Sequence, residues 1–281
     1  MKLFRSLLLI VACSFRAVIT DCLPTEKKAI VIGASSGMGR EIAKLLSKEG
    51  YNVGLVARRI SLLESLQKEI ATPTFIKQID VTHPSARQQL QELIEKMGGL
   101  DLMVISISAY LDNRNATAKN EADFNPQKTW SEKERTLDVD AKGFIAMADV
   151  ALDFFKAQGS GHLVGISSTS GQRGVAYSPE YSAAKACTSY YMEGIRNYLK
   201  QNNLPVKVTD VVAGYVAVEH SRLGEDPSAY WEVTVEQAGK TIVEGIKKQK
   251  QVIYVPSKVW IVSFLLKHLP DYIYNNYLSW L

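Results

Sequence analysis

Hydrophobic positions along the chain alternate between short apolar runs rich in β-branched residues and longer amphipathic stretches. The short runs indicate buried strands, and apolar residues spaced three and four apart indicate helices. This alternation is typical of a parallel sheet covered by helices on both faces. The strands are expected at 28–33, 52–57, 74–79, 101–107, 162–167, 206–212 and 252–255, and the helices near 38–49, 60–70, 84–97, 132–158, 180–203 and 235–249.

Local sequence features support several of these helix starts. Ser131 with Glu134, and Thr234 with Gln237, have the spacing of a capping box, and Pro179 suits a first helical turn. No internal repeat and no linker rich in Pro, Gly or Ser divides the sequence. The predicted fold class is therefore α/β, with a single doubly wound domain and a seven-stranded, mostly parallel sheet. The expected divisions are an N-terminal extension at 1–26, this domain at 27–257 and an apolar helical tail at 258–281.

Composition narrows the class of protein. With 281 residues, 46% of them hydrophobic, the chain is long enough to bury a full core. The net charge is +4, and the densest basic cluster, Lys247 to Lys250, is interpreted as a solvated helix end. A nucleic-acid surface would need a broader basic stripe with interleaved aromatic residues, so no nucleic-acid partner is expected. The three cysteines and four histidines lack metal-site spacing, which predicts a reduced compartment and no metal.

The two ends of the chain leave alternatives open. A basic start at 1–5 and an apolar run at 6–13 resemble a short export or lipid-anchor sequence, although the run is too short to span a bilayer. A dispensable extension or a mis-assigned start codon is favoured instead. The stretch Val259 to Leu269 is apolar apart from Ser263, Lys267 and His268. It could be a membrane-surface helix, but packing on its own domain or on a subunit partner is favoured.

A glycine-rich segment follows the first expected strand and opens the first helix. In this context the pattern predicts a dinucleotide site. Gly33 would allow the tight turn, Gly37 would let the pyrophosphate approach the helix N-terminus, and Gly39 would let helix and strand pack closely. The residues expected to contact the cofactor here are Gly33, Ser35, Ser36, Gly37, Met38 and Gly39.

The end of the second strand bears on which cofactor is bound. Folds that prefer NAD place an acidic residue there to bind the ribose hydroxyls. This sequence has Arg58 and Arg59 instead. Guanidinium groups can form charge-assisted hydrogen bonds to a 2′-phosphate. NADP(H) is therefore predicted in preference to NAD(H).

Tyr181 and Lys185 lie four residues apart on an expected helix, so both face one side of it. A free tyrosine has a pKa of about 10. The nearby ammonium favours the phenolate and lowers that pKa toward the range useful for proton transfer. The same spacing recurs at Tyr254 and Lys258, where Pro256 interrupts any helix.

These motifs together resemble the short-chain dehydrogenase/reductase family over residues 28–255. The glycine pattern precedes a strand that ends in Ser168, and Ser168 stands thirteen residues before Tyr181. The resemblance selects Tyr181 over Tyr254 and implies a Rossmann fold that transfers hydride with NAD(P). It also implies that Tyr181 is the general acid or base, that Ser168 hydrogen-bonds the substrate oxygen, and that Lys185 lowers the tyrosine pKa and holds the nicotinamide ribose.

The resemblance carries over further cofactor contacts. Asp80 and Val81, after the third strand, match the pair that family members place against the adenine ring. Gly214 and Val216, after the sixth strand, match positions beside the nicotinamide carboxamide.

Four departures from the family pattern concern this site. The usual Asn-Asn-Ala-Gly after the fourth strand is replaced within 105–109, and after the sixth strand a proline and a threonine are replaced by Ala213 and Val218. The family asparagine that helps hold a water leading to the lysine becomes Asp140. A carboxylate near Lys185 would raise the lysine pKa and could slow proton relay.

The predicted function is that of an NADP(H)-dependent oxidoreductase that interconverts a carbonyl and an alcohol. The alternative is a catalytically weakened nucleotide-binding regulator on the same fold. A small apolar substrate is expected because aromatic residues surround the expected cleft. A homodimer or homotetramer through 132–158 and 180–203 is expected by resemblance. A cytoplasmic location is expected from the cofactor, with membrane association through the N-terminal segment as the alternative. The aromatic residues expected around the substrate cleft are Tyr110, Tyr215, Tyr230 and Trp231.

Overall fold

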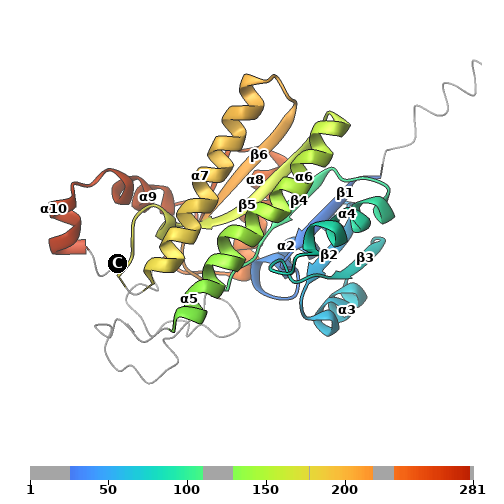
Figure 1. Ribbon diagram of the computed structural model, residues 1–281, viewed down its shortest axis with the longest axis horizontal. Helices are drawn as coiled ribbons and strands as arrows, with labels where there is room; N and C mark the ends of the chain where they lie inside the picture. The colour runs from blue at the N-terminus through green and yellow to red at the C-terminus, as the bar shows by residue number, and fades with distance from the viewer. Residues whose placement is uncertain (1–25, 110–128, 177, 218–230, 279–281) are drawn as a thin grey trace, which may run out of the picture.

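A single seven-stranded sheet organises the protein. The computed structural model describes residues 26–109, 129–176, 178–217 and 231–278 (Figure 1). The strand order is β3-β2-β1-β4-β5-β6-β9, and every paired neighbour is parallel. The predicted α/β doubly wound class is therefore confirmed. The strands are β1 (Lys28–Ile32), β2 (Asn52–Ala57), β3 (Thr74–Gln78), β4 (Leu102–Ile105), β5 (Gly161–Ser168), β6 (Val206–Ala213) and β9 (Val252–Val255).

Strands β2 and β4 are buried along their whole length because helices cover both faces of the sheet. This burial explains why both segments are almost entirely apolar, with Asn52 as the only polar residue of the two strands. The strand order reverses between β1 and β4, since β2 follows on one side and β5 on the other. Ligands of doubly wound sheets bind at the carboxyl ends of the strands at such a reversal.

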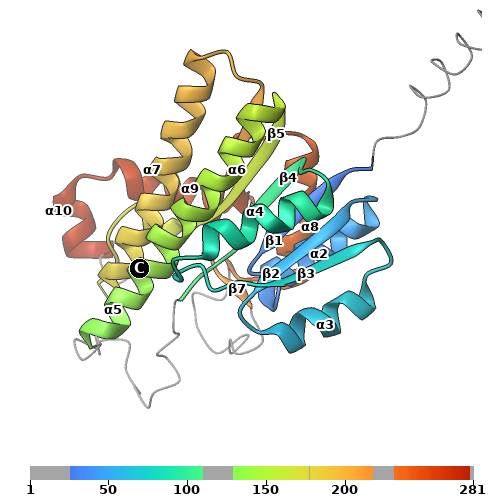
Figure 2. The same cartoon turned by 45° about the vertical axis from the view of Figure 1, so that its right-hand side comes forward.

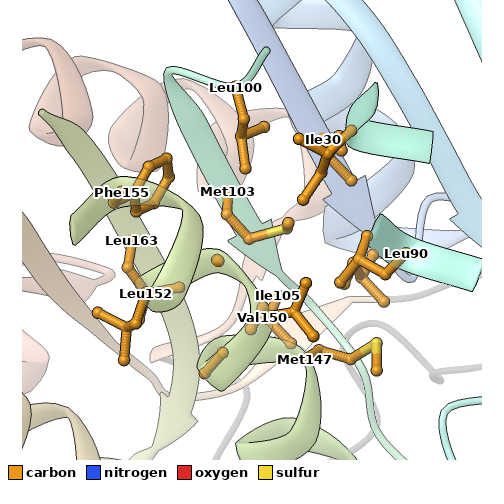
Figure 3. Close-up of a cluster of buried hydrophobic side chains, with 14 of the residues drawn as sticks. Ile30, Leu90, Leu100, Met103, Ile105, Met147, Val150, Leu152, Phe155 and Leu163 are labelled. Carbon is orange, nitrogen blue, oxygen red and sulfur yellow. The ribbon is translucent and has the colours of Figure 1, made fainter. Parts of the chain in front are cut away.

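Two hydrophobic layers hold the helices to the sheet. On one face α4, α6 and α7 pack around Met103 and Phe155, as the close-up in Figure 3 shows. On the other face α2, α3 and α8 pack around Val31 and Leu55. Figures 1 and 2 show these layers on opposite sides of the strands. The helices are α2 (Gly37–Lys48), α3 (Ile60–Glu69), α4 (Ala86–Met97), α6 (Phe144–Gln158), α7 (Pro179–Gln201) and α8 (Val235–Lys247).

The helix expected at 132–158 is not one regular helix. It consists of α5 (Trp130–Leu137), a π-helical turn at Asp138–Gly143, and α6. The capping box predicted at Ser131 and Glu134 is wrong because the helix begins earlier, with Thr129 as its cap. The Thr129 N–H donates to Glu132 Oε2 at 2.7 Å.

Other local predictions are confirmed. Thr234 and Gln237 form the expected reciprocal cap, with N–H to side-chain oxygen distances of 3.1 and 3.3 Å. Pro179 occupies the first turn of α7. Tyr254 lies in β9, whereas Lys258 follows that strand and caps the next helix. The second Tyr-Lys pair is therefore not on one helical face.

The apolar tail packs on its own domain. It forms α9 (Val259–His268), α10 (Asp271–Ile273) and a π-helical turn at Tyr274–Leu278. Arg173 donates to the Leu266 carbonyl at 3.3 Å and pairs with Asp271, while its guanidinium lies 4.3 Å from the centre of the Tyr274 ring. These contacts join the tail to the segment that follows β5.

A short two-stranded sheet, β7 (Val216–Ala217) with β8 (Val233–Thr234), lies outside the main one. In the part of the chain that the structure describes, no helix is both long and apolar enough to cross a membrane. The N-terminal extension, up to residue 25, lies outside the described residues.

Candidate active site

The glycine-rich turn between β1 and α2 is tightly enclosed. Gly33 has φ +90°, and a Cβ atom there would lie 2.0 Å from the Ser106 carbonyl oxygen. A Cβ on Gly39 would lie 2.3 Å from the Gly33 oxygen. Both positions therefore require glycine, because the end of β4 and the start of α2 press against the turn. Gly37 opens α2, whose first-turn N–H groups have no partner within the helix and suit an anion.

Arg59 reaches across to this turn. Its guanidinium donates to Ser35 Oγ at 2.8 Å and to Ser36 Oγ at 2.6 Å. These two bonds hold a positive charge over the glycine-rich turn. Arg58 faces a hollow of about 360 Å³ that Asp80 and Arg135 also line.

Asp80 and Val81 lie beyond β3, as expected from the order of elements. Burial tends to raise the pKa of Asp80, but hydrogen bonds from Thr82 and the charge of Arg58 outweigh it and hold that pKa below its usual value. A Cβ on Gly143 would lie 2.7 Å from Val81 Cγ2, so Val81 packs against the π-helical turn.

Ser168, Tyr181 and Lys185 come together at the carboxyl end of β5. Ser168 is the last residue of that strand, and Tyr181 and Lys185 lie on α7. The Tyr181 phenol is hydrogen-bonded to the hydroxyls of Ser168 and Ser108. The Lys185 ammonium lies 5.6 Å from the centre of the Tyr181 ring. The three predicted residues are thus within reach of one another.

Lys185 is buried against a carboxylate. Its Nζ lies 3.0 Å from Asp140 Oδ1, and it donates to the carbonyls of Ile107 at 3.2 Å and Ile166 at 3.3 Å. Lys185 is 3% exposed and Asp140 is fully buried. An ion pair excluded from water is strong only when further hydrogen bonds satisfy both partners, and the two carbonyls meet that need for the lysine.

The pKa values follow from this burial. Burial favours the neutral amine, but the Asp140 and Tyr181 oxygens outweigh it, so the pKa of Lys185 is raised above 10.5. Burial raises the pKa of Tyr181 above 10.0, and Asp140 adds to that effect, while Lys185 opposes it. Lys185 therefore acts in the predicted direction. The expected net lowering of the tyrosine pKa is wrong because burial outweighs the lysine.

Asp140 joins three segments of the chain. Its Oδ2 accepts from the Ala109 N–H at 2.8 Å, and its own carbonyl accepts from Thr188 Oγ1 at 3.1 Å. Its remaining oxygen faces Lys185. The carboxylate is therefore built into the site by the loop after β4, the π-helical turn and α7.

Sequence reasoning missed several residues of this site. Ser108 and Ala109 belong to the segment recognised only as a departure from the family pattern. Gly171 was not considered, yet a Cβ there would lie 2.7 Å from the Lys185 backbone carbon, so the segment after β5 packs directly on α7. Thr188 was also missed, although its position three residues after Lys185 places it on the same helical face. Its hydroxyl could therefore have been expected near the site.

The region after β6 borders the same site. Ser168 is in register with Ala213, so Gly214 follows directly beside it. The Gly214 N–H donates to the Val255 carbonyl at 2.7 Å, and Val216 lies in β7. Tyr215 is partly exposed and Trp231 is half-buried. Tyr110, Val218 and Tyr230 lie outside the described residues.

Among the residues with described positions, no three His, Cys, Asp or Glu side chains gather as metal ligands would. The parallel sheet, the strand reversal and the enclosed glycine-rich turn define a Rossmann-type α/β protein.

Comparisons with known proteins identify the family. The family model described as short chain dehydrogenase matches residues 27–226. A Myxococcus xanthus protein named as an uncharacterized oxidoreductase is 30% identical over 256 residues, covering 89% of this chain and 95% of that protein. A similarly named Mycobacterium tuberculosis protein is 28% identical and covers 84% of this chain and 90% of its own length. The crystal structure of an acetoin dehydrogenase from Salmonella typhimurium has the same fold, with TM-score 0.66, 18% identity, and coverage of 82% of this chain and 94% of that one.

The chain belongs to the short-chain dehydrogenase family and is therefore an oxidoreductase. Members of this family bind NAD or NADP, and the residues around the glycine-rich turn of this chain fit such a cofactor.

Proposed function

We propose that the protein is an NADP(H)-dependent oxidoreductase that interconverts a carbonyl and an alcohol. One observation supports this most: the hydroxyls of Ser168 and Tyr181 and the ammonium of Lys185 meet at the strand ends, on a fold whose glycine-rich turn suits a dinucleotide. This arrangement supplies a proton donor, an oxygen-binding hydroxyl and a fixed positive charge.

The cofactor would lie along the strand reversal. Gly33, Gly37 and Gly39 would admit the pyrophosphate at the start of α2, with Ser35, Ser36 and Met38 completing the turn. Arg58 and Arg59 would bind a 2′-phosphate, and Asp80 and Val81 would face the adenine. Gly214 and Val216 would border the nicotinamide. When bound, this cofactor supplies or accepts the hydride.

The protein groups would manage the oxygen and its proton. Ser168 donates a hydrogen bond to the substrate oxygen, and Tyr181 delivers a proton to it during reduction or removes one during oxidation. Lys185 stabilises the phenolate that Tyr181 becomes, and it holds the nicotinamide ribose. Asp140 keeps the ammonium charged and in place through the 3.0 Å ion pair. Asp140 thus acts through Lys185, as a positioning residue.

A small apolar carbonyl compound is the substrate class we favour, because Tyr215 directly follows Gly214. The Val233 N–H donates to the Tyr215 carbonyl at 3.2 Å, which brings the segment after Trp231 to the same region. A homodimer or homotetramer is part of the same proposal. It is supported by the exposed aromatic side chains of Tyr190 and Tyr198 on α7, the helix expected to form the subunit contact. We also propose that the protein acts in the cytoplasm, where this cofactor is available.

A second candidate is a nucleotide-binding regulator with weakened catalysis. It is favoured by Asp140, which occupies the position of the family asparagine, and by the raised pKa of Tyr181. The Tyr181→Phe experiment in the Discussion separates the two.

Cofactor preference gives a direct test. Arg59→Ala is expected to weaken NADPH binding about tenfold to a hundredfold, because charge-assisted hydrogen bonds to the 2′-phosphate are lost. NADH, which lacks that phosphate, should be affected much less. Arg58→Ala should act in the same direction. Fluorescence titration with both cofactors measures the effect, and Arg87→Ala, which removes an arginine paired with Asp149 at 2.7 Å, is the control. Equal losses for NADPH and NADH would contradict the preference.

The pH dependence of alcohol oxidation gives another test. Oxidation needs the deprotonated phenol, and burial followed by the Asp140 charge raises the Tyr181 pKa, so the rate should still be rising in the alkaline range. Asp140→Asn removes one cause of that raised pKa. The rising part of the kcat/KM profile should therefore move to lower pH, with Asp138→Asn, an exposed neighbour, as control. An unchanged profile, or one moved to higher pH, would show that Asp140 does not act on the tyrosine.

A further inference from the structure

Helix α9 exposes an apolar stripe. Trp260, Ile261, Phe264 and Leu265 are 54%, 44%, 55% and 46% exposed. Their spacing of one and four residues places them on one side of the helix. The buried residues Val259, Ser263 and Leu266 form the opposite side. An ordinary surface helix has the reverse arrangement, with polar residues facing outward.

The next helix also exposes apolar residues. Tyr272 and Ile273 of α10 are also exposed, and both helices (red in Figure 1) lie together at one side of the molecule. Isolated exposed apolar residues are common, but a contiguous patch marks a surface that is covered by something in the working protein.

The charge around this stripe is mainly positive. From 244 to 271 the sequence contains five lysines and one histidine against two acidic residues, Glu244 and Asp271, and Asp271 is paired with Arg173. Lys258 precedes the helix, and Lys267 with His268 ends it, all three exposed. A groove of about 740 Å³ beside the helix is lined by Trp260 and Phe264, and its charged lining is three lysines, His268 and one carboxylate, Glu244. Apolar and cationic groups therefore share one surface.

This composition argues for a particular occupant. A two-fold contact between identical copies would place the same surface against itself and bring the lysines of both copies together. Repulsion between like charges disfavours that arrangement. Lipid headgroups with negative charge, in contrast, attract juxtamembrane lysines, and tryptophan and tyrosine side chains are enriched at the membrane–water interface.

We propose that α9 docks on the surface of a bilayer that contains anionic lipids, with its apolar stripe in the interface and its lysines at the headgroups. The ten residues of α9 span about 15 Å, and a bilayer core is about 30 Å thick, so the helix lies along the surface. This docking does not depend on the proposed carbonyl chemistry.

The docking helix is also connected to the active site. A Cβ on Gly214 would lie 2.9 Å from Val259 Cγ2, so the start of α9 packs on the proposed nicotinamide border. Near its other end, Arg173 binds the Leu266 carbonyl at 3.3 Å. The buried side of α9 therefore packs next to the proposed nicotinamide border, while its exposed side forms the docking surface.

The test is flotation of the full-length protein with vesicles of phosphatidylcholine, with and without phosphatidylglycerol. We expect the protein to float with the anionic vesicles, less at high salt, and poorly with phosphatidylcholine alone. The double variant Trp260→Ser/Phe264→Ser should lower the bound fraction at least about tenfold. Trp130→Ser, which removes an even more exposed tryptophan from α5, should leave it unchanged. Circular dichroism verifies that both variants fold.

Other outcomes overturn the proposal. Vesicle binding that survives Trp260→Ser/Phe264→Ser but is lost in Leu7→Asp/Leu9→Asp would assign the membrane contact to the N-terminal run. No flotation of the wild type, combined with a smaller assembly for the α9 variant in size-exclusion chromatography, would assign the stripe to a protein interface. Equal binding to vesicles with and without phosphatidylglycerol would show that the lysines do not contribute to docking.

Discussion

Tyr181→Phe is expected to lower kcat/KM for every accepted carbonyl by about 10²–10⁴-fold, the usual contribution of a positioned acid or base. The substitution removes only the phenol oxygen. The ring stays, and with it the contact to the Lys185 ammonium at 5.6 Å, so NADPH binding should change little. The loss should therefore appear in kcat more than in cofactor affinity.

NADPH oxidation across a panel of apolar ketones and aldehydes measures this effect. Tyr190→Phe is a matched control, because it makes the same change on an exposed face of α7. The contrary result is a wild-type protein that binds NADPH yet turns over no carbonyl faster than Tyr181→Phe does. That result would favour a nucleotide-binding regulator over a carbonyl-reducing enzyme.

Asp140→Ala is expected to lower the free energy of unfolding by about 3–5 kcal/mol, because it leaves a buried charge without its partner. Lys185 is 3% exposed, so water cannot readily replace the carboxylate. The pKa of Lys185 is raised above 10.5 in the folded protein, chiefly by Asp140 acting against burial. The stabilisation is therefore fully present at neutral pH and below 10.5, and it declines as pH rises through the folded-state pKa.

Urea unfolding at neutral and alkaline pH measures this difference. Asp138→Ala is the matched control two residues away: its carboxylate lies 3.6 Å from Lys142 in an exposed pair, which is worth at most about 1 kcal/mol. The loss of unfolding free energy for Asp140→Asn should lie between those of Asp140→Ala and Asp138→Ala, because the amide oxygen can still accept a hydrogen bond from the Ala109 N–H. A loss for Asp140→Ala no greater than that of the control would mean that the buried pair contributes little.

The strands could be predicted closely because burial on both faces leaves an unmistakable apolar run. The expected strand at 206–212, for example, is β6 at Val206–Ala213. The glycine-rich turn was equally clear because its spacing between a strand and a helix is a sequence motif. Its physical constraint is partly local, since Gly39 is required by the Gly33 oxygen, and partly distant, since Gly33 is required by the Ser106 carbonyl after β4. The start of α5 was misplaced because Thr129 and Ser131 are both good caps, and only the backbone path selects Thr129.

The surroundings of the candidate site were less accessible to sequence reasoning. Asp140 was recognised as unusual, but its contacts to Ala109 and Lys185 depend on three segments that are distant in sequence. The π-helical turn that carries Asp140 has the composition of an ordinary helix. The net pKa of Tyr181 depends on how deeply the phenol is buried, which spacing alone does not specify.

Arg173 has a mechanical consequence. By contacting the end of α9, Asp271 and the Tyr274 ring at once, it ties the tail to the segment after Ser168. A protein resting on lipid through α9 would then present its proposed active site to the headgroups in one fixed orientation. Turnover measured in dilute solution and turnover measured on a vesicle would be two different quantities, because only the second includes how an apolar substrate partitions from the lipid.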